Sequence, residues 1–319
     1  MTMANVRFAP DRLRQWLPLI ALVVLVLFVG AMQPEFLAPA TLLGLASDTA
    51  VLFVLATGVS FVIMLGGIDL SIQSMASLAS VIVALTVGKL GYFSFALAVL
   101  IGAIAGCLGG LAHIRLKIPS FISTLALGGV LAGTALVISH ERSITLSETE
   151  RAYLGWITGV SFGLPHEVII GAVLLLIADV VQRRTAFGRY SNAIGAGEEA
   201  AYASGVKVGR QKIIAFTLSA AFAAFAGVML AGRLASGSPT LANEQLLPAI
   251  AAVVVGGTAI TGGVGNIWRT LVGALIISVV RTGMTFIGVD IFAQQIVFGS
   301  VLIFAVAVTI DRSKIPIVK

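Results

Sequence analysis

The chain alternates between long apolar runs and short polar connections. The first run spans about 16–32, and nine more follow at about 42–65, 72–88, 92–112, 121–139, 167–182, 213–232, 247–260, 270–287 and 291–309. About 20 apolar residues in a helix cross the roughly 30 Å hydrocarbon core of a bilayer. These runs are continuous rather than alternating, so they predict helices and not barrel strands. The pattern predicts an all-α polytopic membrane protein with about ten transmembrane helices.

Composition agrees with this interpretation. Hydrophobic residues make up 58% of the chain and charged residues 11%, against about 25% charged residues in ordinary soluble domains. The net charge of +6 does not indicate nucleic-acid binding, because the basic residues lie between the apolar runs rather than on one water-facing surface. Three arginines precede the first run, but that run is too long for an ordinary signal peptide. We therefore expect a retained first helix.

Basic residues also predict the orientation, since positively charged loops stay in the cytoplasm. Ten spans that start from a cytoplasmic N-terminus place fifteen of the 20 Lys and Arg residues inside and five outside. Both termini, including segment 1–15, are therefore predicted to be cytoplasmic. Residues 1–319 read as one transmembrane domain in a cell inner membrane, with a basic inner loop at 182–212.

The longest outer loop covers about 140–166. Within it, Ser147 and Glu150 have the spacing of a capping box, ahead of Tyr153, Leu154 and Trp156. We expect a short amphipathic helix there, lying at the outer membrane interface.

Small residues recur at four-residue intervals inside two of the runs. Gly102, Gly106 and Gly110 form overlapping GxxxG patterns, and Gly129 with Gly133 forms another. Such positions let helix backbones approach closely in lipid. We favour packing within one subunit over a dimer interface for these glycines.

The chain offers little of the chemistry of an enzyme. His113, His140 and His166 lie at loop edges, with no Cys or carboxylate at a metal-ligand spacing. The sequence holds no GxxxxGK[ST] motif, so it cannot bind ATP through a P-loop. We therefore predict no catalytic residues, no metal site and no cofactor in this chain.

Acidic residues inside apolar runs are candidates for function, because burying a carboxylate in lipid is costly. Asp179 precedes Arg183 by one helical turn, which predicts a structural ion pair. Asp48 lies near the outer start of the second run and is expected to be wet. Asp69 lies in the sequence GGIDLS at 66–71, where glycines allow unwound backbone. It either helps to cap the following helix or lines a solute path.

Four motifs occur in order along the chain. They are GGIDLS at 66–71 followed by IQS at 72–74, LKIPSFISTL at 116–125, GAGEEAA at 195–201 with SGV at 204–206, and GGTAITGG at 256–263. In this combination the chain resembles the ribose-type, simple-sugar branch of ABC importer permeases, within the branched-chain amino acid and ribose permease superfamily. The resemblance covers about 40–310.

The resemblance implies a type II importer fold of about ten helices per subunit. It also implies a second permease copy or paralogue, separate cytoplasmic ATPase subunits that hold ATP and magnesium, and an external solute-binding protein. The pathway residues that we select on this basis are Asp69, Ser71, Gln73 and Thr124. The segment implied to couple the permease to its ATPase comprises Gly195, Gly197, Glu198, Glu199, Ala200, Ala201, Ser204, Gly205 and Val206.

Within that segment, the two glutamates open a short helix at the end where its dipole favours negative charge. Gly205 follows this helix and is predicted to stop it in a left-handed conformation. Two alternatives stay open at this point. One is a permease of the amino-acid branch, and the other is a secondary transporter, which usually needs buried ionisable residues at the membrane midplane.

Overall fold

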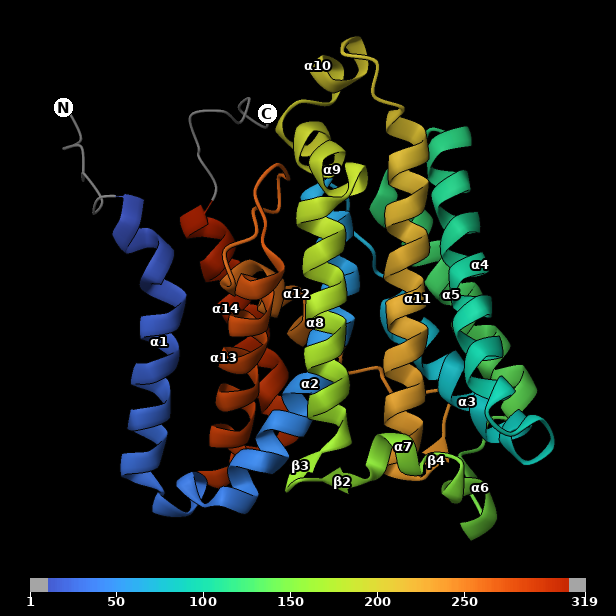
Figure 1. Ribbon diagram of the computed structural model, residues 1–319, viewed down its shortest axis with the longest axis vertical. Helices are drawn as coiled ribbons and strands as arrows, with labels where there is room; N and C mark the ends of the chain where they lie inside the picture. The colour runs from blue at the N-terminus through green and yellow to red at the C-terminus, as the bar shows by residue number, and fades with distance from the viewer. Residues whose placement is uncertain (1–10, 310–319) are drawn as a thin grey trace.

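The computed structural model describes residues 11–309, and these form a bundle of helices with their axes largely aligned (Figure 1). The longer helices are α1 (Asp11–Met32), α2 (Pro39–Met64), α3 (Ile72–Leu90), α4 (Phe93–Arg115), α5 (Ser120–Ser139), α8 (His166–Arg184), α11 (Val208–Leu234), α13 (Ile267–Phe286) and α14 (Ile291–Thr309). The shorter helices are η1 (Pro34–Leu37), α6 (Glu148–Ala152), α7 (Gly155–Thr158), α9 (Ala186–Ala196), α10 (Glu198–Ala203) and α12 (Leu246–Val255). The described residues are mostly helical, as predicted.

Within the described residues, six helices are long and apolar enough to cross a membrane by length and composition: α2, α3, α4, α5, α11 and α13. A helix also covers each of the other four predicted runs, but these helices are shorter in their apolar part or more charged. α8, for example, carries Glu167, Asp179 and two arginines within its 19 residues. The coarse prediction of a multi-pass helical protein is confirmed, whereas a count of ten complete spans is not.

The clearest departure from the predicted runs is α12. We expected a span at 247–260, but the helix ends at Val255 because the chain turns through Gly256 and Gly257, the latter with φ +95°. Ten helical residues rise about 15 Å, which is about half of a hydrocarbon core. The chain then runs through a non-helical loop, 256–266, to the start of α13.

The core of the bundle lies where α11 packs against α2, α3 and α4. α2 and α3 are the most enclosed candidate spans, whereas α5 is the least enclosed. Large apolar side chains such as Leu27, Leu108 and Val137 stay exposed on α1, α4 and α5. Apolar residues on the outer surface of a bundle suit contact with lipid.

Glycines allow the closest of these helix contacts. A Cβ added to Gly102 would lie 2.6 Å from the Cβ of Ala224, and one added to Gly110 would lie 3.0 Å from the Cα of Ile213, both on α11. Packing within one subunit is therefore confirmed for the α4 glycines. Gly129 and Gly133 differ, because nothing lies within 4 Å of an added Cβ at either position on α5. For these two, the expected packing within one subunit is not seen among the described residues.

Small elements close the end of the bundle opposite α10 (Figure 1). β1 (Ile144–Thr145) pairs antiparallel with β4 (Ser236–Gly237), and β2 (Val160–Ser161) pairs antiparallel with β3 (Leu164–Pro165). The capping box predicted at Ser147 and Glu150 is present at the start of α6. These hydrogen bonds, first from the Ser147 side chain and then from its backbone, lower the pKa of Glu150 from its ordinary value of 4.5.

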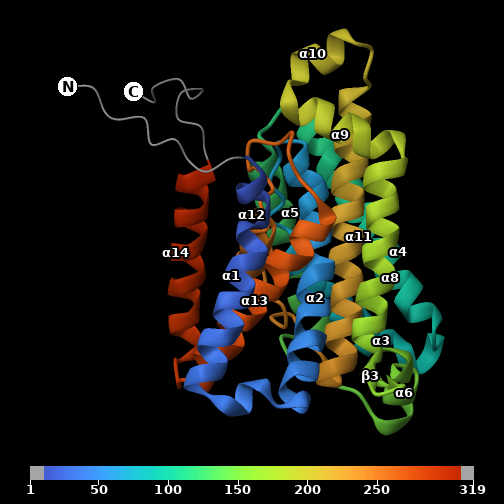
Figure 2. The same cartoon turned by 60° about the vertical axis from the view of Figure 1, so that its left-hand side comes forward.

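The start of α1 and the end of α14 lie at the same end of the bundle as α9 and α10 (Figures 1 and 2). The ends of α4 and α8 and the starts of α11 and α13 lie there too. This is the end to which the predicted orientation assigns most of the basic residues. Segment 1–10 and residues 310–319, with Arg7, Arg312, Lys314 and Lys319, lie outside the described residues.

Candidate solute pathway and coupling junction

The GGIDLS motif forms a break between two helices. α2 ends at Met64, the chain turns through Gly66 with φ +78°, and α3 begins at Ile72. The segment 67–71 is non-helical, as the glycines predicted. Its backbone donors and acceptors therefore need partners other than those of a helix.

Hydroxyl groups at the start of α5 supply those partners. The backbone N–H of Ile68 donates to Ser120 Oγ at 3.1 Å, and that of Leu70 donates to Thr124 Oγ1 at 3.0 Å. Thr124, predicted as a pathway residue, is about 1% exposed and also lies 3.3 Å from the carbonyl oxygen of Ile68. The LKIPSFISTL motif thus holds the unwound GGIDLS motif in place.

Asp69 is buried at the centre of this break. Its Oδ1 accepts hydrogen bonds from Ser71 N at 2.9 Å and from Ser71 Oγ at 2.6 Å. Ser71 is the N-cap residue of α3, yet its side chain makes no bond to a helix N–H. Asp69 therefore supports the start of α3 indirectly, by holding its N-cap residue. Gln73 is half-buried in the first turn of α3 and is the most accessible of the four predicted pathway residues.

The predicted coupling segment, 195–206, comprises the end of α9, all of α10 and the turn after it. Glu198 and Glu199 occupy the first turn of α10, as expected from the helix dipole. Gly205 follows the helix with φ +83°, and Val206 N donates back to the carbonyl oxygen of Ala201 at 3.1 Å. This is the geometry of a Schellman stop, so the predicted helix stop at Gly205 is confirmed.

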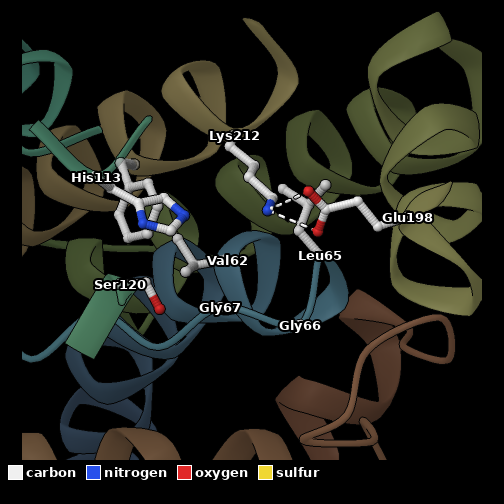
Figure 3. A pocket seen from close by; sticks show the side chains of 9 residues that line it. Val62, Leu65, Gly66, Gly67, His113, Ser120, Glu198 and Lys212 are labelled. Atoms are coloured by element: carbon white, nitrogen blue, oxygen red, sulfur yellow. Dashed lines mark hydrogen bonds and ion pairs between the residues drawn. The ribbon is translucent and has the colours of Figure 1, made fainter. Parts of the chain in front are cut away.

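An ion pair fastens α10 to the body of the bundle. Lys212 Nζ lies 2.8 and 2.7 Å from the two carboxylate oxygens of Glu198. The pair borders a cavity of about 230 Å³ that also reaches Gly66 and Gly67 of the break. Figure 3 shows Lys212 and Glu198 on one side of this cavity and His113 with Ser120 on the other. The coupling segment and the GGIDLS break therefore share one small space.

A second contact between these regions is made by backbone atoms alone. A Cβ added to Gly195, at the end of α9, would overlap Gly263 N and the carbonyl oxygen of Met64. Gly263 N in turn donates to that same Met64 oxygen at 3.0 Å, and an added Cβ on Gly262 would lie 2.7 Å from Gly66 N. We call this contact of Met64, Gly66, Gly195, Gly262 and Gly263 the glycine junction.

Gln182 holds the 256–266 loop beside the junction, and it is not among the residues predicted from the sequence. Its side chain is buried, with Nε2 donating to the carbonyl oxygen of Gly265 at 2.8 Å and Oε1 accepting from Ile267 N at 3.0 Å. Ile267 is the first residue of α13, so the amide of α8 satisfies a free N–H of another helix. The sequence signal that could have identified Gln182 is its position at the end of an apolar run, directly before two arginines.

The four motifs of the sequence therefore meet at one end of the bundle. The GGIDLS break, the start of α5, the end of α9 and the 256–266 loop contact one another through hydrogen bonds and backbone packing. An unwound segment between two helices that are suited to cross a membrane is a feature of many transport proteins. Fold and site define the membrane permease component of a transporter.

Comparison with known proteins identifies the family. Residues 41–306 match the family described as branched-chain amino acid transport system / permease component, and the chain belongs to it. It is 38% identical to the ribose import permease protein RbsC of Bacillus subtilis (strain 168), covering 93% of this chain and 92% of that protein. It is 33% identical to the L-arabinose transport system permease protein AraH of Escherichia coli (strain K12), and the match covers 93% of this chain and 90% of that protein. The chain is thus a transport subunit rather than an enzyme.

One solved structure shares the fold at low sequence identity. It is an inward-facing structure assigned to a metal-chelate type ABC transporter, with a TM-score of 0.53 and 15% identity over 94% of this chain and 100% of that one. At this identity the likeness concerns the fold alone.

Proposed function

We propose that this chain forms the membrane pathway for a sugar or sugar-like solute in an ATP-driven importer. An external binding protein delivers the solute, and separate ATPase subunits, which hold ATP and magnesium, drive its movement. The observation that carries the proposal is the glycine junction, because it joins the surface segment α9–α10 directly to the break that contains Asp69. The ribose and arabinose permeases among the relatives support a sugar as solute.

In this arrangement α10 docks into an ATPase subunit. Its exposed face carries Glu199, and the Tyr202 side chain is 74% exposed beside it. Aromatic side chains in such positions often anchor protein interfaces. Movement of α10 then reaches the GGIDLS break through the junction and through the Glu198–Lys212 ion pair.

The proposed topology has ten membrane segments in an inner membrane, α12 being a half-length one, with both termini and α10 in the cytoplasm. A second permease copy or paralogue completes the pathway between the subunits. Cysteine labelling tests this topology. A cysteine at Thr149 should react with an impermeant thiol reagent added outside, and a cysteine at Gly197 should react only after the membrane is opened. The reverse pattern would contradict it.

Uptake into vesicles tests the function itself. The permease, its ATPase and its binding protein, reconstituted together, should import labelled ribose or arabinose, or another sugar, only when ATP is present on the side that holds the ATPase. The amino-acid alternative is supported by the family's description as a branched-chain amino acid transport system / permease component. Uptake of leucine that sugars do not inhibit would support that alternative and contradict a sugar pathway.

A further inference from the structure

A second cavity lies at the opposite end of the bundle from α10. It has a volume of about 260 Å³ and lies between α2, α11, α13 and the segment 241–245. Its polar lining consists of Asp48, Arg233, Gln245, Ser278 and Arg281, and leucine and valine side chains form the rest of the wall. We call it the outer pocket.

Charge in the outer pocket is unbalanced. Arg233 pairs with Asp48, with 2.5 Å between the guanidinium and the carboxylate oxygen. Arg281 lines the same pocket and is half-buried, but no hydrogen bond or ion pair reaches its guanidinium from any residue in 11–309. The lining therefore carries one positive charge in excess. Gln245 and Ser278 add two uncharged polar side chains to the same lining.

The position of Arg281 makes this excess charge informative. The residue lies within α13, one of the six helices suited to cross a membrane, five residues before its end. An ionisable side chain in such a segment is costly and usually has a partner or a function. An arginine that has no partner in the described part of its own chain, and that faces a cavity, is suited to receive an anion from outside the chain.

The geometry points to an oxyanion. The planar guanidinium group donates two parallel hydrogen bonds, which match a carboxylate or a phosphate better than any neutral group. Ser278 lies on α13 one turn before Arg281, and Gln245 approaches from the other wall, so both can bond to hydroxyl groups beside the anion.

We propose that the outer pocket binds a carboxylate or phosphate group, with Arg281 as the residue that holds it. Two sources fit this chemistry: an acidic sugar as the transported solute, or the headgroup of an anionic lipid. The first source rests on the proposed function and would narrow it to sugars that carry an acidic group. The second source is independent of the solute.

Binding measurements on the assembled importer test the proposal without ATP. In the solute arm, the complex in neutral detergent is titrated with gluconate, with inorganic phosphate and with uncharged ribose. In the lipid arm, the complex is placed in phosphatidylcholine membranes, and retention of labelled phosphatidylglycerol is measured. We expect saturable binding of an anion in at least one arm, and the arm that responds identifies the source.

Three variants make the test specific. Arg281→Gln should lower the affinity for the anion roughly tenfold or more, since hydrogen bonds to charged groups are stronger than those between neutral groups. Arg281→Lys should keep part of the affinity because the charge remains. Arg142→Gln, which removes an exposed arginine outside the pocket, should bind like the unaltered protein.

Two results would overturn the inference: no saturable anion binding in either arm, or equal binding by Arg281→Gln and the unaltered protein. Arg281→Gln is replaced by Ser278→Ala if its size-exclusion elution and thermal unfolding show that it fails to fold. Ser278→Ala should then lower the affinity for the same anion. Normal affinity in Ser278→Ala would then count against the pocket. Because binding is measured without nucleotide, failed uptake in the vesicle experiment leaves this result unaffected.

Discussion

Adding one methyl group to the glycine junction should uncouple the importer. In Gly195→Ala, the new Cβ would lie 2.9 Å from the carbonyl carbon of Gly262, and closer still to Gly263 N and the Met64 oxygen. Ordinary van der Waals contact begins near 3.4 Å, so the Gly262 contact alone requires a separation of about 0.5 Å, and the two closer contacts require more. No side chain can rotate away, because every atom in the overlap belongs to the backbone.

Two contributions set the free-energy cost of Gly195→Ala. Overpacking of this kind typically costs about 1–3 kcal/mol. Separation also weakens the hydrogen bond from Gly263 N to the Met64 oxygen, which contributes about 1 kcal/mol. A total of about 2–4 kcal/mol is large beside the roughly 1–3 kcal/mol by which sites are typically coupled. We therefore expect the connection between α10 and the GGIDLS break to be lost while most of the bundle stays folded.

The assay compares ATP hydrolysis with uptake in the same reconstituted vesicles. Gly195→Ala should hydrolyse ATP at a rate that loaded binding protein no longer stimulates, with uptake reduced by about tenfold or more. Gly44→Ala is the matched control: it adds a methyl group to α2 at its other end, where nothing lies within 4 Å. Normal stimulation and uptake in Gly195→Ala would refute the junction as the coupling path.

Four further predictions follow from single contacts. Gln182→Leu removes the hydrogen bonds to the loop and to α13, so it should lower the free energy of unfolding by about 1–3 kcal/mol, as measured by thermal unfolding. It should also lower the number of solute molecules moved per ATP hydrolysed; a normal number would make the role of Gln182 purely structural. Gly205→Val has open space around the Cβ but a φ of +83°, so it should misplace α10 and abolish stimulated ATP hydrolysis while binding-protein docking persists; normal stimulation would exclude this loop from coupling. Asp69→Asn should reduce uptake at normal membrane abundance if Asp69 lines the path, and should lower membrane abundance if its main role is to hold the start of α3. If uptake and abundance both stay unchanged, both roles are excluded. The pKa of Glu150 is lowered on folding, so its stabilising effect is present above about pH 4.5 and is lost as pH falls through the folded value; hydrogen-exchange protection of α6 should fall in that range, and an equal fall in Glu150→Gln would contradict this.

Local sequence signals predicted local structure well. The break at 66–71, the stop at Gly205 and the capping box at Ser147 each follow from one or two residues with strong backbone preferences, and the structure has all three. The ion pair of Asp179 and Arg183, one turn apart on α8, is also present, with 2.6 Å between the charged atoms. Such features need no knowledge of which helices are neighbours.

Contacts between distant segments were not predictable in this way. Asp48 was expected to be wet, and it is 52% exposed, but it also pairs with Arg233 on α11. Gln182 bonds to residues more than 80 positions away. The hydropathy pattern also overestimated the length of α12, because an average over 247–260 does not detect the turn at Gly257. These features depend on which helices pack together, and a single apolar pattern does not encode that.

The glycine junction shows why three of the motifs contain glycines. A contact between side chains can absorb a displacement by changing rotamers, whereas packed segments of backbone have few other arrangements. Gly195 brings the end of α9 against Met64 and Gly263, and Gly262 approaches the backbone at Gly66. In the coupling mechanism that we propose, a movement of α10 passes to the end of α2 and to the 256–266 loop together. From there only a few residues of unwound chain separate it from Asp69, one of the residues that we predict to line the solute path.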